Sequence, residues 1–168
     1  MRSQAVYAST VLDPEPMTTV EHHPSERPPE AAAPGFGVHL TLDGYGGSAR
    51  LLADADHVLA CLGELPDRLG MHKLMDPVLV EVGQLGPKDP GGVTGFVIIA
   101  ESHISIHTFP LRGFVSADVY TCKNSMDTEQ ICQYFTEAFA LEDLEVNLVK
   151  RGTRYPQRDI YGSPPGRA

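Results

Sequence analysis

The chain has 168 residues, of which 42% are hydrophobic, and its formal net charge is -9 at pH 7. This length suits a single domain with a sizeable core, and an acidic balance without a Lys/Arg stripe argues against nucleic-acid binding. No stretch approaches the roughly 20 apolar residues of a membrane span, and the start has no basic region followed by an apolar run, so we expect neither a membrane protein nor a secretory signal. The three cysteines form no CxxC pair, and the cytoplasm is the expected compartment.

Residues 1–36 differ in composition from the rest of the chain. They are rich in Pro, Glu, Ala and Ser and show little periodicity, which is typical of a disordered tail. His22 and His23 fall in this tail, and we interpret them as solvated side chains rather than metal ligands. We therefore expect one folded domain over residues 37–156, followed by a flexible C-terminal tail over 157–168.

The domain begins with an alternating segment, VHLTLD at 38–43, which predicts a strand. Residues 54–70 predict a helix with Asp54 as its N-cap. Pro66 lies inside this segment, and we expect it to kink the helix or to end it early.

Strand signals dominate the middle of the chain. PVLVEV at 77–82 predicts a strand, and the Gly and Pro content of 85–92 predicts a loop. VTGFVIIA at 93–100 predicts a buried strand that runs into a polar motif, and FVSADVYT at 114–121 predicts another strand after a turn.

The last elements are a helix and a strand. Asp127 can cap a helix that begins at Thr128 and carries an apolar stripe at helical spacing. LEVNLVK at 144–150 predicts the final strand. The order β-α-β-β-β-β-α-β with short connections predicts an α+β two-layer sandwich, with a mostly antiparallel sheet and both helices on one face. The other face of the sheet is then available to a partner subunit.

The motif ESHISIHTFP, residues 101–110, is unusually polar for a core strand. Its β-branched alternation favours a strand, yet it contains a run of polar side chains: Glu101, Ser102, His103, Ser105 and His107. Polar groups at this density in an apolar strand cost free energy unless they are paired or functional. The motif is therefore the first candidate for the functional site.

Two familiar kinds of site fit this motif poorly. A zinc site would combine His103 and His107 with Cys122, but four residues of a strand span roughly 13 Å, too far for two imidazoles on one ion. A serine hydrolase would use Ser102 or Ser105 with a base, an acid and an oxyanion hole, but the sequence has no GxSxG elbow. We expect no bound metal.

A third use of the motif is self-processing. A serine hydroxyl attacks the carbonyl of the residue before it, which replaces the peptide bond with an ester. β-Elimination then cuts the chain, and hydrolysis of the resulting dehydroalanine leaves a pyruvoyl group at the new N-terminus. Ser102, Thr94 and His107 offer the nucleophile, a hydroxyl for the oxyanion and a base, although spacing alone does not single out this reaction.

The segment GGVTGFVIIAESHISIHTFPLRGFVSADVYTC, residues 91–122, resembles the signature of the prokaryotic-type S-adenosylmethionine decarboxylases, small pyruvoyl enzymes of polyamine synthesis. Its ESHxSIHT core followed by DVxTC is highly specific. HLTLDGY at 39–45 and KRGTRYP at 150–156 are more weakly similar to the opening strand and the end of that family. The resemblance covers most of residues 37–156 and implies an α+β sandwich that dimerises through its sheets.

The resemblance also implies roles for individual residues. Ser102 becomes the pyruvoyl group, which binds the substrate as a Schiff base, so cleavage falls between Glu101 and Ser102. His107 is similar to the family's processing base, and Thr94 stands where the family has a hydroxyl residue that assists processing. Cys122 resembles the acid that returns a proton to the substrate carbon after CO2 leaves. Ser102 and His107 differ in parity, so a straight strand directs them to opposite faces, and a bend or bulge near the cleavage site has to re-aim one of them.

The expected substrate pocket departs from the family pattern. After HT(W/F)P the family usually has a Glu, and the resemblance implies that this Glu binds the ribose hydroxyls of the nucleoside. This chain has Leu111 there, whose side chain accepts no hydrogen bond. Ser116 stands where alanine is common. Asp43, Glu81 and Asp118 are candidates to bind the distal cation of a different substrate.

We therefore expect a decarboxylase of S-adenosylmethionine, which makes the aminopropyl donor for spermidine, and we keep two alternatives. One is a pyruvoyl-dependent decarboxylase of L-ornithine or L-arginine on the same scaffold, because these substrates need no ribose ligand. The other is a regulatory paralogue that binds an active subunit without processing, although the joint presence of Ser102, His107 and Cys122 argues against it. The active form is expected to be a homodimer of processed protomers.

Overall fold

The computed structural model describes residues 35–100, 102–156 and 158. The expected N-terminal tail lies almost wholly outside this part, as do Glu101 and most of the expected C-terminal tail. The strands are β1 (Gly37–Tyr45), β2 (His72–Lys73), β3 (Val78–Val82), β4 (Gly92–Ala100), β5 (Ser102–Phe109), β6 (Phe114–Thr121) and β7 (Asp143–Arg151). The helices are α1 (Ala49–Ala53), α2 (Ala55–Arg68), the short 3-10 helix η1 (Pro110–Arg112) and α3 (Thr128–Phe139).

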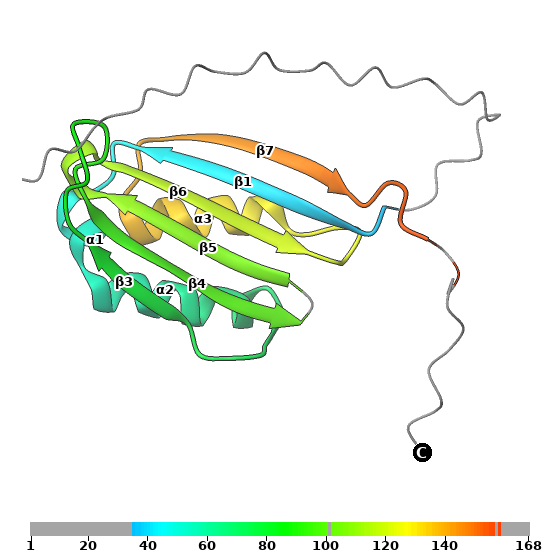
Figure 1. Cartoon of the computed structure of the whole chain (residues 1–168). Coiled ribbons are helices and arrows are strands. Elements are labelled where there is room, and N and C mark those ends of the chain that lie inside the picture. The colour runs from blue at the N-terminus through cyan, green and yellow to red at the C-terminus, as the bar shows by residue number, and fades with distance from the viewer. Residues whose placement is uncertain (1–34, 101, 157, 159–168) are drawn as a thin grey trace, which may run out of the picture. The chain divides into compact units, whose positions relative to one another are not determined.

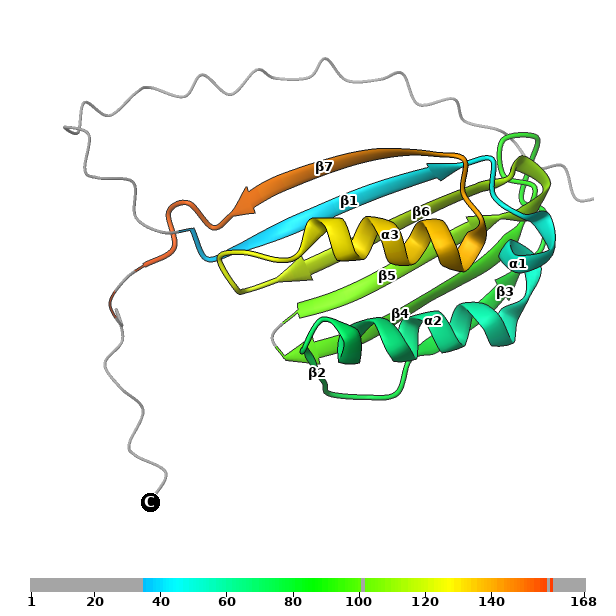
Figure 2. The same cartoon turned by 180° about the vertical axis from the view of Figure 1, so that it is seen from behind.

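The strands form one antiparallel sheet in the order β2-β4-β5-β6-β1-β7, with β3 also paired to β4. Figure 1 shows the face of the sheet that carries no helix, which we call the open face, and Figure 2 shows α2 and α3 lying across the opposite face. The predicted α+β two-layer sandwich is confirmed. Among the described residues, no helix is both long enough and apolar enough to cross a membrane.

Alternation along each strand separates a buried face from the open face. In β1 and β5 the even-numbered side chains face the helices, and in β4 and β6 the odd-numbered ones do. Together with the apolar stripes of α2 and α3 they form one core, whose buried members include Leu40, Leu42, Val58, Leu62, Leu65, Val97, Ile99, Ile104, Ile106, Val115, Val119, Ile131, Phe135 and Phe139. Burial of each large side chain contributes about 1.5–3 kcal/mol, so this core holds the two layers together.

Both long helices begin at the residues that the sequence predicts. The Asp54 carboxylate accepts a hydrogen bond from the His57 amide, and the Asp127 carboxylate accepts one from the Gln130 amide. These caps satisfy backbone donors that have no partner inside a helix. The short helix α1 was not predicted, because one turn carries too little periodicity to be recognised.

We expected Pro66 to kink helix α2 or to end it early; the helix continues through Pro66 to Arg68, so it does not end early. Proline removes one amide donor from the helix and disturbs the carbonyls one turn earlier. Two side chains donate to carbonyls in that turn. Lys73 Nζ donates to the Gly63 carbonyl at 2.7 Å, and the Tyr134 hydroxyl donates to the Cys61 carbonyl at 3.3 Å. These bonds hold the carbonyls on either side of Leu62, whose own carbonyl loses its helical partner because Pro66 has no amide hydrogen.

Thr108 is a polar residue inside the core, with 2% of its surface exposed. Its hydroxyl donates to the Leu52 carbonyl at 2.7 Å and accepts from the Val93 amide at 3.0 Å. The hydroxyl therefore joins α1, β4 and β5 at one point. Because both backbone groups are satisfied by it, the buried hydroxyl is compatible with the core.

Thr108→Val keeps the shape of this side chain but leaves the Val93 amide and the Leu52 carbonyl without their partner. We expect the free energy of unfolding, measured by urea denaturation, to fall by about 2–4 kcal/mol. Thr136→Val on α3 is the matched control and should change it by less than about 1 kcal/mol. An equal loss in both variants would show that the Thr108 bonds do not stabilise the fold.

Candidate active site

The open face carries the predicted residues Asp43, Ser116, His107 and Thr94 in one row across four strands, which we call the polar row. Their backbones pair directly, as Asp43 with Ser116, Ser116 with His107, and His107 with Thr94. The Thr94 hydroxyl lies 3.2 Å from Nδ1 of His107. All four side chains are half-buried. The sheet therefore places a base and three polar neighbours on one exposed face.

An aromatic row lies next to the polar row, one step along the same strands. It consists of Tyr45, Phe114 and Phe109, whose ring centroids are 5.3 Å apart for Tyr45–Phe114 and 5.6 Å apart for Phe109–Phe114. Neighbouring rows on one face of a strand are about 7 Å apart. His107 is thus close enough to this row for one small molecule to contact both.

The three rings line a pocket of about 610 Å³. Its other lining residues are Lys88, Asp89 and Arg112. Arg112 Nη2 donates to the Pro87 carbonyl at 2.9 Å, which ties η1 to the loop between β3 and β4. The aromatic row was missed at the sequence level. The sequence did contain a signal for it. Each of the three aromatic residues is the first or last residue of a strand, and the alternation of buried and exposed residues places all three on the open face.

The predicted substrate residue Asp118 is engaged in a hydrogen-bond chain on the same face. It accepts from the Ser105 hydroxyl at 3.2 Å and from Nε2 of His39 at 3.1 Å. Arg151 Nη1 donates to Nδ1 of His39 at 2.8 Å, and because arginine has no acceptor, Nε2 carries the proton that His39 donates. Arg151 also lies 5.0 Å from the centre of the Tyr120 ring. Asp118 is therefore less available to a substrate than Asp43.

Ser102 lies apart from the polar row, at the first position of β5 and opposite Ile99. Its side chain faces the helices, and its hydroxyl oxygen is buried without a hydrogen-bond partner among the described residues. The pairing with β4 stays regular from Ser102 to His107, so the described strand contains no bulge between them. Along a regular strand the two residues are about 16 Å apart and on opposite faces.

Cys122 follows the last residue of β6 and is half-buried. Tyr120 pairs with His103, so the end of β6 lies beside the start of β5. The predicted residues thus form two groups, Ser102 with Cys122 at one end of the sheet, and Thr94 with His107 farther along it. Glu101 lies outside the described residues.

Leu111 is 81% exposed on η1. It lines a separate pocket of about 350 Å³ that also contains Glu81, and it does not line the aromatic pocket. Position 111 therefore supplies no carboxylate and does not line the aromatic pocket.

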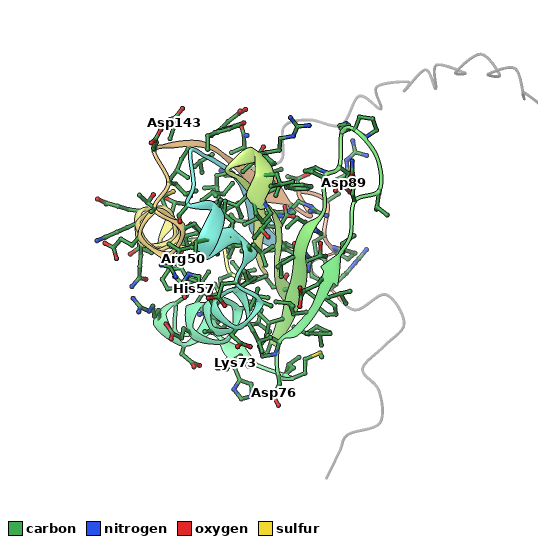
Figure 3. The ribbon with its side chains drawn as sticks, turned by 90° about the vertical axis from the view of Figure 1, so that its left-hand side faces the viewer. Arg50, His57, Lys73, Asp76, Asp89 and Asp143 are labelled. Carbon is green, nitrogen blue, oxygen red and sulfur yellow. The ribbon has the colours of Figure 1, made fainter. Side chains whose placement is uncertain are left out.

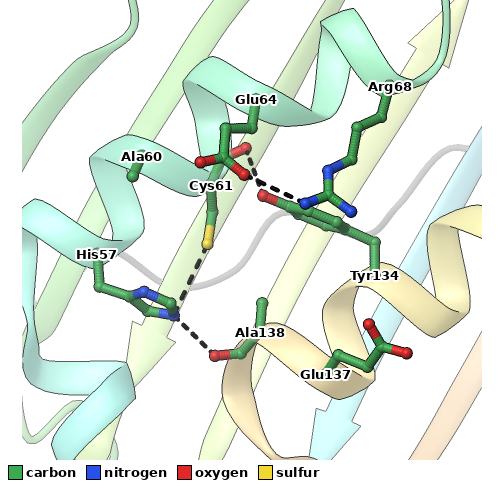
Figure 4. A pocket seen from close by; sticks show the side chains of 8 residues that line it. All are labelled: His57, Ala60, Cys61, Glu64, Arg68, Tyr134, Glu137 and Ala138. Atoms are coloured by element: carbon green, nitrogen blue, oxygen red, sulfur yellow. Dashed lines mark hydrogen bonds and ion pairs between the residues drawn. The ribbon is translucent and has the colours of Figure 1, made fainter.

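A further pocket, of about 240 Å³, lies between α2 and α3 and is lined by none of the predicted site residues (Figure 4). His57 Nε2 donates to the Ala138 carbonyl at 2.7 Å, and Cys61 Sγ lies 3.8 Å from the same nitrogen. Burial raises the pKa of the Cys61 thiol and of the Tyr134 hydroxyl. Both groups are therefore neutral at pH 7. The hydrogen bonds from His57 to Ala138 and from Tyr134 to Cys61 join α2 to α3.

No group of three or more His, Cys, Asp or Glu side chains in residues 35–100, 102–156 and 158 is arranged to hold a metal ion. On a strand, His103 and His107 are too far apart to share one.

A family model described as S-adenosylmethionine decarboxylase matches residues 38–152, from β1 through β7. The chain belongs to the S-adenosylmethionine decarboxylase family. The S-adenosylmethionine decarboxylase proenzyme of Pyrococcus abyssi is 34% identical over 117 residues, which cover 70% of this chain and 79% of that protein. The proenzyme of Archaeoglobus fulgidus is also 34% identical over 117 residues, with 69% and 97% covered.

The fold agrees with this family. The crystal structure of the adenosylmethionine decarboxylase from Aquifex aeolicus VF5 matches with a TM-score of 0.58 at 28% identity, over 71% of this chain and 93% of that one. The predicted family is thereby confirmed, and this family is one of pyruvoyl-dependent carboxy-lyases.

Proposed function

We propose that this chain is a self-processing decarboxylase that acts on S-adenosylmethionine with a pyruvoyl group made from Ser102. The observation that carries the proposal is the Ser102 hydroxyl, which is buried at the start of β5 without a partner among the described residues. An unpaired buried hydroxyl costs about 1–3 kcal/mol, and such groups call for a functional explanation. The position also suits cleavage, because it directly follows the connection between two paired strands.

Self-processing begins with the Ser102 oxygen attacking the Glu101 carbonyl. The peptide nitrogen leaves with a proton, and an ester joins the two residues. A base then removes the proton on the Ser102 Cα, the ester oxygen leaves with Glu101 as a carboxylate, and the chain is cut. Water hydrolyses the dehydroalanine that remains and releases ammonia, which leaves the pyruvoyl group.

His107 is our candidate for the base, with Thr94 holding its ring at Nδ1. The distance of about 16 Å between Ser102 and His107 is too long for proton transfer within one regular strand. We infer that a second copy of the chain stacks on the open face, that the start of β5 turns Ser102 from the helix side toward this face, and that each His107 then serves the Ser102 of its partner. Exposed apolar side chains on this face, Val78, Val80, Phe96 and Ile98, support such a homodimer.

The pyruvoyl carbonyl supplies the sink for the electrons released with CO2. Cys122, beside the start of β5, would then donate the proton that replaces CO2 on the substrate carbon. The aromatic row lies about 23 Å along β5 from Ser102 of the same chain, so in the proposed homodimer it would serve the Ser102 of the partner. It supports a nucleoside substrate, since a purine can stack on its rings. The cytoplasm stays our predicted compartment for this chemistry.

One observation favours L-ornithine or L-arginine as the alternative substrate. Leu111 offers no ligand for a ribose diol. Asp43, by contrast, lies in the polar row two strands away from His107, with Ser116 between them. Asp43, and with less freedom Asp118, would then bind the distal cation.

Purified protein should run as two chains, residues 1–101 and 102–168, on a denaturing gel, with the smaller one blocked at its N-terminus. Ser102→Ala should remain a single chain, because no hydroxyl can attack Glu101. Ser105→Ala is the matched control and should be cut like the wild type, since its hydroxyl bonds Asp118. A wild-type chain that stays intact for days would contradict the pyruvoyl proposal and favour the regulatory paralogue.

Processed protein should release CO2 from carboxyl-labelled S-adenosylmethionine faster than from labelled L-ornithine or L-arginine. Phe109→Leu should raise KM for S-adenosylmethionine about 10-fold, because one stacking ring is lost. Faster release from ornithine or arginine, unchanged by Phe109→Leu, would instead establish the alternative substrate.

Complementation tests the homodimer. When Ser102→Ala and His107→Ala chains with different tags are produced together, mixed dimers contain one intact Ser102 opposite one intact His107. We expect the His107→Ala chain to be cut in the mixture and to remain intact when produced alone. A His107→Ala chain that stays uncut in purified mixed dimers would place both residues of the reaction in the same protomer.

A further inference from the structure

The loop between β3 and β4 brings one carboxylate, that of Asp89, to the aromatic pocket. Figure 3 views the molecule along the strands and shows Asp89 on the loop, on the side of the sheet opposite His57 of the helix layer. The loop is held in place by the bond from Arg112 to the Pro87 carbonyl. Asp89 therefore lies beside the rings that support a nucleoside substrate.

Asp89 organises its own loop. One carboxylate oxygen, Oδ1, accepts from the Gly91 amide at 3.0 Å. Its backbone carbonyl accepts from the amides of Leu85 and Gly86 at 3.1 and 3.2 Å. The second oxygen, Oδ2, accepts no hydrogen bond and forms no ion pair within the part of the chain that the structure describes. The loop thus positions a carboxylate and leaves one oxygen free.

The other acidic candidates are placed differently. Glu81 shares a pocket with Leu111 and does not line the aromatic pocket. Glu145 accepts from the Tyr45 hydroxyl at 3.3 Å, and it too is absent from the lining. Among the described residues, Asp89 is the acid that lines the aromatic pocket.

We propose that Asp89 selects the substrate by accepting hydrogen bonds from its distal end, in place of the carboxylate that position 111 lacks. The inference rests on the proposed function and names a residue of the same site. Two distal groups have the required donors. A ribose diol presents two hydroxyls, and the ammonium or guanidinium of a basic amino acid presents a cation that a carboxylate binds.

Asp89→Asn tests this proposal. The amide oxygen of Asn can still accept from the Gly91 amide, so the loop keeps its turn, but a donor replaces Oδ2. We expect self-processing to be complete, kcat to change less than about 3-fold, and KM to rise about 10- to 100-fold, as for the loss of hydrogen bonds to a charged group. Asp76→Asn removes the same charge from the connection between β2 and β3 and should leave KM unchanged.

Substrate analogues identify the group that Asp89 binds. If the diol is bound, the difference in KM between wild type and Asp89→Asn should vanish with 2′,3′-dideoxy-S-adenosylmethionine, a probe without the two hydroxyls. If a distal cation is bound, the difference should appear with L-ornithine, and L-norvaline, which lacks the amine, should be turned over equally poorly by both proteins.

Two results would overturn the inference in distinguishable ways. A processed Asp89→Asn protein with the KM of the wild type, for each substrate that is turned over, would refute the role of Asp89 and leave the proposed function standing. A wild-type protein that neither cuts itself nor releases CO2 would refute the proposed function, and the inference with it.

Discussion

The arrangement of this protein depends on one constraint, the two-residue period of side chains in a sheet that is covered by helices on a single face. Every strand must direct one set of side chains into the core and the other set to the open face. Thr94, Ser116 and His107 can therefore gather in one row while their sequence neighbours Val93, Val115 and Ile106 remain fully packed. A shift of one residue in any strand would exchange the two sets and destroy core and site together.

Ser102 shows what happens where this division is broken. It faces the helices, as Thr108 does on the same strand, but only Thr108 has partners in the described structure. The Thr108 hydroxyl stabilises the folded state, whereas the buried Ser102 hydroxyl lowers its stability. The Thr108 hydroxyl satisfies backbone groups of α1 and β4, whereas the Ser102 oxygen is buried without a partner among the described residues. A hydroxyl without a partner is well suited to being consumed, because its loss breaks no hydrogen bond within the described part of the chain.

The sequence predicts the sheet, its open face and both long helices, because these depend on periodicity and capping, which are local. Asp54 and Asp127 could be recognised as caps for this reason. Pro66 could not be judged locally, since the side chains of Lys73 and Tyr134 that bond the carbonyls of its helix come from other elements. The sequence also predicts that Ser102 and His107 point to opposite faces of a straight strand. It does not predict that β5 pairs regularly with β4 between them, which keeps the two side chains apart. Asp89 was not predicted as a site residue. Its proposed role depends on the loop between β3 and β4 lying beside the ends of β1, β5 and β6, which are distant from it in the sequence.

The order of strands gives the expected cut a topological consequence. Residues before position 102 supply β1, β2, β3 and β4, and those after it supply β5, β6 and β7, so in the order β2-β4-β5-β6-β1-β7 the two pieces interleave. Neither piece can leave without breaking the pairing of β4 with β5 and the pairing of β1 with both β6 and β7. The cut chains should therefore unfold together as one unit, but refolding them becomes a reaction between two molecules. For such a protein the lifetime of the folded state, set by its unfolding barrier, matters more than its equilibrium stability.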